Sequence, residues 1–466
     1  MDKAEWLDDH ARYFIALAVA VLVLPAVLGS SPTIFNDGDV SWHLATGQWI
    51  LDHRAIPRTD PFSFTWTGKP WVPIEWLAEL ALAIAYRLAG YSGISALITA
   101  ALLALHAVVF FGASRSIRPF AALGTVVAMD VVLIPMMLAR PHVLAWVLVA
   151  SWTYLLVRAR TKERAPPIAA ALLLTVWTNL HGSFVIGLVL AAFFGLEALI
   201  GSTDRGRALL RWSVFGLACL IAVFVNANGI DGVVHPFRIA NLEILPLVDE
   251  WKPSNPAVTP FFFVALTGVL VLIWLKRPKM HPVRWLLLAV LLAMALFQVR
   301  HQAVLAIVSA ILLPQGFGRV AMPSTQGKVL RAATPAAALA LILARAVVPT
   351  APSPGEANPW KLIAAVPSEL RSQPVLNGYV MGGPLILSGI RTYVDGRADM
   401  YGDELVADYK MITDGDAARL DAAVRRWNIR WAILPHRYKK LVALLDHSPG
   451  WQRLHQDSTG IVFARR

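Results

Sequence analysis

The stretch GISALITAALLALHAVVFFG, residues 93–112, is followed almost at once by SRSIR, residues 114–118. The first stretch has no Asp, Glu, Lys or Arg and is as long as the ~20 residues that a helix needs to cross a bilayer. The second is a basic cluster. This alternation recurs along a chain that is 57% hydrophobic, only 15% charged and has a mean hydropathy of +0.57. Since soluble domains are about a quarter charged, the sequence predicts a polytopic α-helical membrane protein.

About eleven transmembrane helices are expected, because apolar runs of near-spanning length recur between residues 13 and 348. Every second connection between them carries a basic cluster. By the positive-inside rule these connections lie in the cytoplasm, which puts the N-terminus inside and the C-terminal region outside a bacterial inner membrane. The runs are 13–29, 93–112, 120–138, 143–157, 167–179, 184–200, 212–226, 260–275, 284–298, 303–313 and 332–348. The clusters are 114–118, 157–164, 204–211, 276–284 and 319–331.

The net charge of +12 is distributed over these alternate connections. We therefore interpret it as a topology signal and expect no nucleic-acid partner. The alternation holds only if the segment Glu75–Gly90 does not cross the membrane, since an extra span would invert every later connection. We predict that this segment is a helix at the outer interface, with Trp71 and Trp76 at the headgroup level.

Two parts are expected: a transmembrane domain at 1–349, whose first outer loop is 30–92, and a small extracytoplasmic α/β domain at 350–466. The run PTAPSPG, residues 349–355, is typical of a linker. Beyond it, short β-type runs alternate with helical ones. The expected strands are 374–376, 391–394, 431–434, 452–455 and 461–464, and the expected helices are 404–412, 417–427 and 438–445.

A pair of aspartates, Asp37 and Asp39, follows the first apolar run. Asp39 is expected to be the N-cap of a short helix from Val40 to about Asp52, whose apolar face can lie on the membrane. The rest of the loop is interrupted by prolines and is expected to be irregular. Long connections are usually functional; the alternative is that Asp39 is only a helix cap.

Polar residues gather at the outer ends of the predicted spans. Groups of this kind at membrane depth are costly and tend to be functional, so we predict a site at the outer leaflet. Each group also has a structural alternative, as a helix cap or a headgroup anchor. The candidate catalytic residues are Asp39 and Asp37, and the candidate substrate-binding residues are His43, Glu75, Arg140, His142, Asn179, His181, Arg300 and His301.

Two further groups are expected to be structural. Asp130 and His106 lie on neighbouring spans at a similar depth, which favours a buried pair, with a proton path as the alternative. Residues 395–399, Asp-Gly-Arg-Ala-Asp, are typical of a turn closed by an ion pair rather than of a site.

The order of these features resembles the GT-C glycosyltransferase superfamily, which includes protein O-mannosyltransferases and aminoarabinose transferases. There an acidic pair in the first outer loop supplies the catalytic carboxylate, and Asp39-Val40 stands at that pair's position, so that Asp37 is left to take the place of the second acid. The helix that starts at Glu75 resembles the family's second juxtamembrane helix. The Arg140-Pro141-His142 and Trp177–Gly182 motifs resemble those of a less characterised bacterial branch.

The resemblance implies an inverting glycosyltransferase whose donor is a sugar on a polyprenyl phosphate, an amphiphile with its phosphate at the outer headgroup level. Arginine forks suit phosphate oxygens, so Arg140, Arg300, His142 or His301 could bind that phosphate. Asp39 or Asp37 would act as the base toward an acceptor that is a glycan, a lipid or a protein. The resemblance implies no cofactor; two carboxylates and a histidine leave Mg²⁺ or Mn²⁺ open as an alternative.

Two alternatives to this function remain open. A transporter or flippase of a lipid or glycan would have broken helices and pseudo-symmetric halves, and no second half matches the first. A scaffold that only presents the outer domain leaves the polar residues of the outer loops unexplained.

Overall fold

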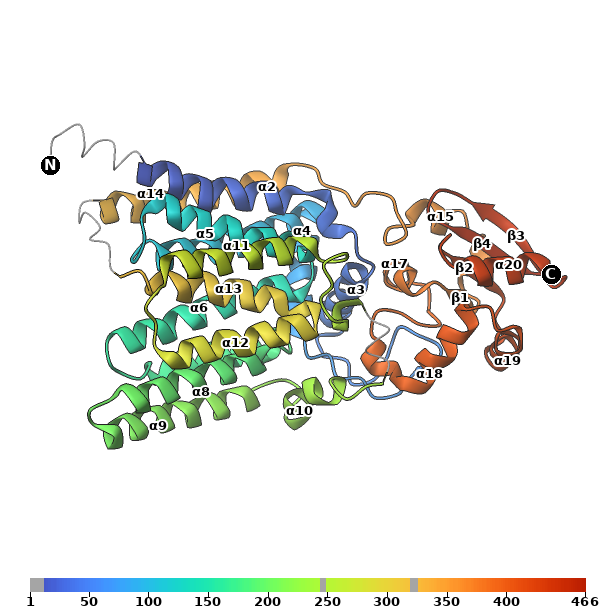
Figure 1. Cartoon of the computed structure of the whole chain (residues 1–466). Helices are drawn as coiled ribbons and strands as arrows, with labels where there is room; N and C mark the ends of the chain where they lie inside the picture. Colours follow the sequence, from blue (N-terminus) through green and yellow to red (C-terminus); the bar gives the residue numbers. More distant parts are fainter. Residues whose placement is uncertain (1–11, 244–248, 319–325) are drawn as a thin grey trace.

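The computed structural model describes residues 12–243, 249–318 and 326–466. It has two parts that lie end to end: a long bundle of helices and a smaller mixed α/β region that contains the C-terminus (Figure 1). The predicted basic cluster at 319–331 falls partly outside the described residues, as does the start of the chain.

The bundle contains all the predicted apolar runs, each in a helix. Within the described residues, six helices are long and apolar enough to cross a membrane, by length and composition, and five more apolar helices are shorter, at 10–17 residues. The number of eleven spans thus remains a prediction. The main helices are α2 Leu24–Ser30, α4 Trp76–Ala113, α5 Pro119–Leu133, α6 Pro141–Thr161, α7 Leu172–Leu180, α8 Phe184–Gly201, α9 Arg205–Phe224, α11 Pro260–Lys276, α12 Pro282–Phe297, α13 Gln302–Gln315 and α14 Gln326–Val347.

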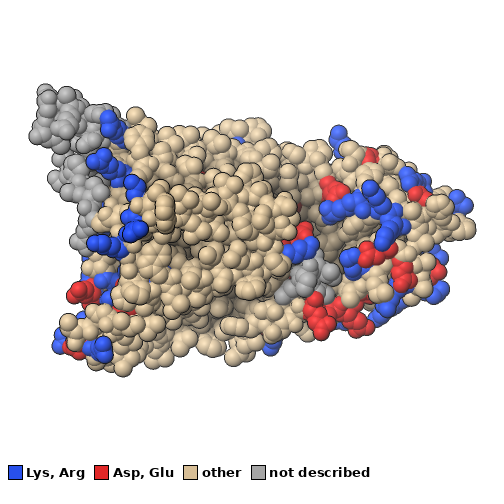
Figure 2. All heavy atoms as spheres, in the orientation of Figure 1, with Lys and Arg blue, Asp and Glu red and all other residues tan. Residues whose placement is uncertain are grey.

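The charges of the bundle gather at its two ends. Figure 2 shows Lys and Arg at the end far from the α/β region, a long band almost without charged side chains, and mixed charges over the α/β region. The basic end is formed by the connections that follow α4, α6, α8 and α11. This is the arrangement that the alternating clusters predict.

Helix α4 is broken near its first third. Ala89 (φ −151°) and Gly90 (φ +59°) leave the helical region, and a β-carbon on Gly93 would lie 1.9 Å from the Ala85 carbonyl oxygen. The chain therefore bends so sharply that its two limbs touch. The first limb has about 13 residues and is about 20 Å long, shorter than the ~30 Å hydrocarbon core. This geometry favours the predicted non-crossing helix.

Helix α3, Asp39–His53, differs from the prediction in two ways. Its N-cap is Gly38, and the Asp39 backbone N–H is bonded to Asp37 Oδ1 at 2.8 Å. The prediction that Asp39 caps the helix is wrong, because Asp39 is already the first helical residue and its N–H donates to the carboxylate of Asp37. The prediction that one face of the helix lies on the membrane is also wrong. Residues 40–47 are all buried, since α3 is enclosed between α4 and α17, Gly382–Leu387.

The α/β region is built on a four-stranded sheet of order β1-β2-β4-β3. Strand β1 pairs parallel with β2, and β4 pairs antiparallel with β2 and β3. Four of the five expected strands and all three expected helices are present. The elements are α15 Trp360–Ala364, α16 Ser368–Arg371, β1 Val375–Asn377, α18 Ala398–Thr413, α19 Ala417–Trp427, β2 Trp431–Leu434, α20 Lys439–His447, β3 Trp451–Gln456 and β4 Ile461–Arg465.

The fifth expected strand, residues 391–394, is not part of the sheet. Thr392 instead bonds to the first loop: its carbonyl accepts from the Phe64 N–H, and its own N–H donates to the Phe62 carbonyl. Trp42 and Trp71 of the same loop lie in the hydrophobic core of the α/β region. The hydrophobic core of the α/β region therefore includes residues from both sides of the predicted boundary between 1–349 and 350–466. The position of that boundary along the chain stays a prediction.

Candidate active site

The predicted polar residues converge where the bundle meets the α/β region. They come from the start of α3, the start of α4, the residue before α6, the end of α7, and two single-turn helices, η6 Asp249–Trp251 and η7 Val299–His301. The turn that carries Arg140 is held near the aspartates because the neighbouring Ala139 N–H donates to the Ile34 carbonyl at 2.7 Å. The backbone of Arg140 itself is extended, as expected for a residue before proline.

Arg140 joins both aspartates. Its Nη1 lies 3.0 Å from Asp37 Oδ2 and its Nη2 lies 3.0 Å from Asp39 Oδ2. Nη1 also donates to Glu250 Oε1 at 2.5 Å. The Asp37 and Asp39 side chains are 21% and 19% exposed, whereas that of Glu250 is 44% exposed. One guanidinium thus contacts three carboxyl groups, of which Glu250 is the most accessible.

The carboxyl of Asp39 differs electrostatically from its neighbours. Burial, with a further contribution from the charge of Asp37, raises the pKa of Asp39 to about 8, against the opposing effect of Arg140. Arg140 instead lowers the pKa of Glu250 to about 2. A carboxyl with a pKa close to the working pH suits general-base catalysis. Asp39 therefore has the properties of a base, and Glu250 those of a permanent anion.

A second cluster alternates carboxylates and imidazoles. His43, one turn after Asp39, has Nδ1 3.1 Å from Glu79 Oε1 and Nε2 3.6 Å from Glu75 Oε2. Glu75 Oε1 lies 3.3 Å from His181 Nε2. Because the Ser183 N–H donates to His181 Nδ1 at 3.0 Å, the proton of a neutral His181 lies on Nε2, which faces Glu75.

Burial determines the charge states of this second cluster. It raises the pKa of Glu75 to about 7 and lowers the pKa of His43 and of His181 well below the usual range. Both imidazoles are therefore neutral at neutral pH, and Glu75 is poised to bind or release a proton. Glu79 was not among the predicted residues; its spacing of four from Glu75 on a helix was the available signal.

The remaining predicted residues differ in their surroundings. The guanidinium of Arg300 lies over the Trp251 ring, 4.3 Å from its centre. His142 Nε2 bonds to the Met136 carbonyl at 2.8 Å. His301 follows Arg300 in η7, and its imidazole has no hydrogen bond or ion pair within the described part of the chain.

The side-chain amide of Asn179 makes all its hydrogen bonds with other groups of the protein. Its Oδ1 accepts from Trp76 Nε1 at 2.9 Å and from the Ala227 N–H at 3.1 Å, while its Nδ2 donates to two backbone carbonyls. This geometry assigns Asn179 to holding α4, α7 and the turn after α9 together. A part in substrate binding stays a prediction.

The α/β region contacts the site through backbone. A β-carbon on Gly396 would stand 1.9 Å from Asp39 Oδ1 and 2.6 Å from Trp42 Nε1. One on Gly38 would stand 1.9 Å from the Val380 carbonyl oxygen. The interface is therefore tight enough that only glycine fits at these positions. No local pattern in the sequence indicated that this part of the chain reaches the aspartates.

The two groups expected to be structural form closed pairs. His106 Nε2 lies 2.9 Å from Asp130 Oδ2, and its Nδ1 lies 2.7 Å from the Leu102 carbonyl oxygen. In the turn at 395–399, Arg397 bonds to Asp395 and also to Asp60 of the first loop, each at 2.7 Å. The expected ion pair is thus present, buried rather than on the surface.

The carboxylates and imidazoles of the candidate site are not arranged as metal ligands. Among residues 12–243, 249–318 and 326–466, no three His, Cys, Asp or Glu side chains are arranged to hold one. The guanidinium of Arg140 lies between Asp37 and Asp39, where a cation would have to bridge them.

No protein-family model and no curated protein matches the sequence. Solved structures do. ArnT from Cupriavidus metallidurans in the apo state matches with a TM-score of 0.52 and 13% identity, over 97% of both chains. The same protein bound to undecaprenyl phosphate matches with a TM-score of 0.51 and 14% identity, over 96% of this chain and 97% of that one.

A third match is the Archaeoglobus fulgidus oligosaccharyltransferase tethered to an acceptor peptide, with a TM-score of 0.50 and 11% identity over 96% of this chain and 74% of that chain. Both proteins are GT-C glycosyltransferases. The chain has the GT-C fold. The likeness covers the GT-C bundle and the α/β region together, and it confirms the resemblance that the order of sequence features indicated. At these identities it shows the fold alone.

Proposed function

We propose that the chain is an inverting glycosyltransferase that moves a sugar from a polyprenyl-phosphate donor to an acceptor, with Asp39 as the base. The observation that carries the proposal is the contact of Asp39 and Asp37 with one arginine, in a site where burial raises the pKa of Asp39 to about 8. The GT-C fold supports it, and the ArnT match is to a structure that contains undecaprenyl phosphate.

In the proposed reaction, the Asp39 carboxylate takes the proton of an acceptor hydroxyl or amine. The acceptor atom forms a bond to the anomeric carbon while the bond from that carbon to the phosphate oxygen breaks. The polyprenyl phosphate leaves with the electron pair of that bond. A single displacement of this kind inverts the anomeric centre, and its rate depends on alignment of the acceptor with the leaving group.

The leaving phosphate gains negative charge and needs cationic partners. Arg140 and Arg300 supply them. Because Glu250 is the most exposed anion on Arg140, we propose that the donor phosphate takes the position of its carboxylate on the guanidinium. Asp37 then serves to keep Arg140 in place and, by its charge, to keep the pKa of Asp39 high. His142, His181 and His301 remain candidates for contacts to the sugar.

The proposed orientation follows from charge. The basic end of the bundle lies in the cytoplasm by the positive-inside rule, so the site and the α/β region lie outside, in the inner membrane of a bacterium. The donor phosphate would then approach from the outer leaflet. The acceptor is a glycan, a lipid or a protein; the matched oligosaccharyltransferase is tethered to an acceptor peptide.

The test is consumption of donor. Purified protein is incubated with a panel of polyprenyl-phosphate sugars together with glycan, lipid and peptide acceptors, and released polyprenyl phosphate is measured for the wild type, Asp39→Asn, Asp37→Asn and Asp52→Asn. Asp52 lies on the same helix but is exposed and paired with Arg87, so its variant is the matched control. We expect Asp39→Asn to lose about 10²–10⁴-fold in rate and the control to stay near wild type.

Two outcomes would overturn the proposal. One is that the wild type consumes no donor while reconstituted vesicles move a lipid-linked substrate, which identifies a flippase. The other is that Asp39→Asn, correctly folded, turns over donor at the wild-type rate.

A further inference from the structure

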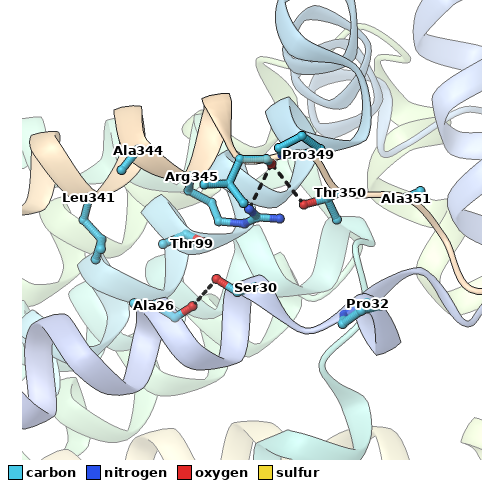
Figure 3. A pocket seen from close by; sticks show the side chains of 11 residues that line it. Ala26, Ser30, Pro32, Thr99, Leu341, Ala344, Arg345, Pro349, Thr350 and Ala351 are labelled. Atoms are coloured by element: carbon cyan, nitrogen blue, oxygen red, sulfur yellow. Dashed lines mark hydrogen bonds between the residues drawn. The ribbon is translucent and has the colours of Figure 1, made fainter.

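A pocket of 390 Å³ lies on the side of the bundle, away from the residues assigned to the site. It is bounded by the end of α2, the second limb of α4 and the end of α14, where the chain leaves the bundle for the α/β region (Figures 1 and 3). Ala26, Leu341 and Ala344 form apolar walls, and Ser30, Thr99, Arg345 and Thr350 supply the polar lining.

Arg345 is the unusual residue of this pocket, because it is 7% exposed and has only neutral partners. Its Nε donates to Ser95 Oγ at 2.7 Å, and its Nη1 donates to the Val348 carbonyl at 3.1 Å. Nη2 has no hydrogen bond to the described residues, and Figure 3 shows the guanidinium at the pocket between Thr99 and Thr350.

Among the described residues, other enclosed arginines have a carboxylate partner or, in Arg300, an aromatic ring. Arg140 is paired with Asp37, Arg284 with Glu197 and Arg397 with Asp395. Within the described part of the chain, Arg345 is in no such pair. An arginine stays protonated in a protein, and a buried charge without a counter-ion is costly. An anion in this pocket would therefore offset the cost of burying the Arg345 guanidinium.

The surroundings of the pocket show which kind of molecule carries that anion. The outward faces of the two helices that flank it are apolar, with Val23 and Val27 of the first span and Leu339, Leu343 and Val347 of α14 all at least half exposed. These side chains suit the acyl chains of a bilayer. The guanidinium lies within one turn of the end of α14, which is the level of lipid headgroups. The chemistry of the pocket and of its flanks thus fits an amphiphile with an anionic head.

We propose that this pocket binds the phosphodiester headgroup of an anionic membrane phospholipid, with Arg345 as its charge partner and the acyl chains along α2 and α14. A phosphodiester carries one negative charge and matches the single arginine. The phosphate monoester of a polyprenyl phosphate carries nearly two. The bound lipid would fix the end of α14 at Pro349 and Thr350, where the chain turns toward the α/β region. This site is separate from the one proposed for sugar transfer.

The test is lipid binding by native mass spectrometry of detergent-solubilised protein titrated with phosphatidylglycerol or phosphatidylcholine. The variants are Arg345→Gln, Arg345→Lys and Ala344→Leu. Ala344 lines the pocket and is exposed, so leucine fills the space while the guanidinium stays. The matched control is Arg238→Gln, since Arg238 is 59% exposed and paired with Asp231.

We expect one phosphatidylglycerol to be retained by the wild type and by the control. Its apparent Kd should rise at least about tenfold in Arg345→Gln and in Ala344→Leu. The apparent Kd of Arg345→Lys should lie between those of the wild type and Arg345→Gln. Three results would overturn the proposal: phosphatidylcholine bound as tightly as phosphatidylglycerol; binding unchanged in both Arg345→Gln and Ala344→Leu; or inorganic phosphate raising the Tm as much as phosphatidylglycerol does, which would identify a site for free anions.

Discussion

Gly396 lies directly against Asp39, although 357 positions separate them: a β-carbon on Gly396 would stand 1.9 Å from Asp39 Oδ1. The candidate base is therefore covered by the backbone of the α/β region rather than by a side chain. Trp42 Nε1 also lies close to this contact, 2.6 Å from the same point. The α/β region is thus a wall of the site, and changes in its turn at 395–399 should reach the chemistry.

Gly396→Ala should displace the Asp39 carboxylate, because the added methyl overlaps an oxygen that Arg140 holds in place. We expect the transfer rate to fall at least about tenfold, since small misplacements of a catalytic group are costly. The control is Gly450→Ala, also in the α/β region, where a β-carbon meets nothing within 4 Å. Wild-type kcat/KM in Gly396→Ala would show that the contact does not constrain Asp39.

The rate should depend on pH through Asp39. Since the base must be ionised and its pKa is raised to about 8, kcat/KM should rise about tenfold per pH unit below pH 8 and level off above it. Burial raises the pKa of Glu75 to about 7, so the Glu75→Gln variant tests whether Glu75 contributes to the pH dependence of kcat/KM. We expect this variant to keep the rise in kcat/KM that ends near pH 8. A limb near 4 in the wild type would assign Asp39 an ordinary pKa.

The same ionisation should affect stability. The unfolded chain loses the Asp39 proton near pH 4, whereas the folded protein keeps it until about pH 8 because burial raises its pKa. The free energy of unfolding should therefore fall as pH rises between these values. Asp39→Asn removes the titrating group, so its Tm should fall less steeply over pH 5–8 than that of the wild type. Parallel Tm curves would contradict this expectation.

Arg140→Gln should be more harmful than Arg140→Lys. Either change leaves Asp37, Asp39 and Glu250 close together, but lysine keeps one positive charge while losing the two-armed contact. We expect about a 100-fold loss of kcat/KM or more for glutamine, and a pH limb displaced upward, because the opposing charge that lowers the pKa of Asp39 is gone. Arg238→Gln is the control, and an unmoved pH limb in Arg140→Gln would count against the assigned contact.

Glu79→Ala should destabilise the protein, while Glu79→Gln should be tolerated. Alanine leaves His43 Nδ1 buried without its partner at 3.1 Å, which costs about 1–3 kcal/mol, whereas glutamine keeps an acceptor oxygen at the same place. Thermal unfolding of the two variants in one detergent gives the comparison. Equal Tm values would show that the pair with His43 adds nothing to stability.

Arg397→Met should separate the first loop from the α/β region. Arg397 is 1% exposed and joins Asp395 to Asp60, so its loss leaves two buried carboxylates without a counter-ion, at a cost of about 3–5 kcal/mol. We expect faster proteolysis within residues 57–73 and a lower Tm. Arg453→Met, at an exposed pair with Asp446, should cost no more than about 1 kcal/mol. Similar effects of the two changes would contradict the difference in burial.

Much of the fold could be predicted because its signals are local. The apolar runs, the basic connections and the alternating elements beyond residue 355 are each visible within a short window of sequence. The prediction failed where a distant contact decided the structure: residues 391–394 have a β-type composition but bond to Phe62 and Phe64 of the first loop, and α3 is amphipathic enough to suggest a membrane surface but is enclosed by α4 and α17.

By itself, the sequence determined that the chain is a multi-helix membrane protein, that one end of its bundle is basic, and that Asp37, Asp39 and Arg140 belong to the other end. Only the tertiary structure decided that one guanidinium holds both aspartates, which lie 103 and 101 positions before it, that Glu250 and Glu79 join them, and that Gly396 covers Asp39. The physical reason is the range of the interactions. Hydrophobicity and charge act along the local chain, whereas contact, burial and the resulting pKa of Asp39 exist only once distant segments are packed together.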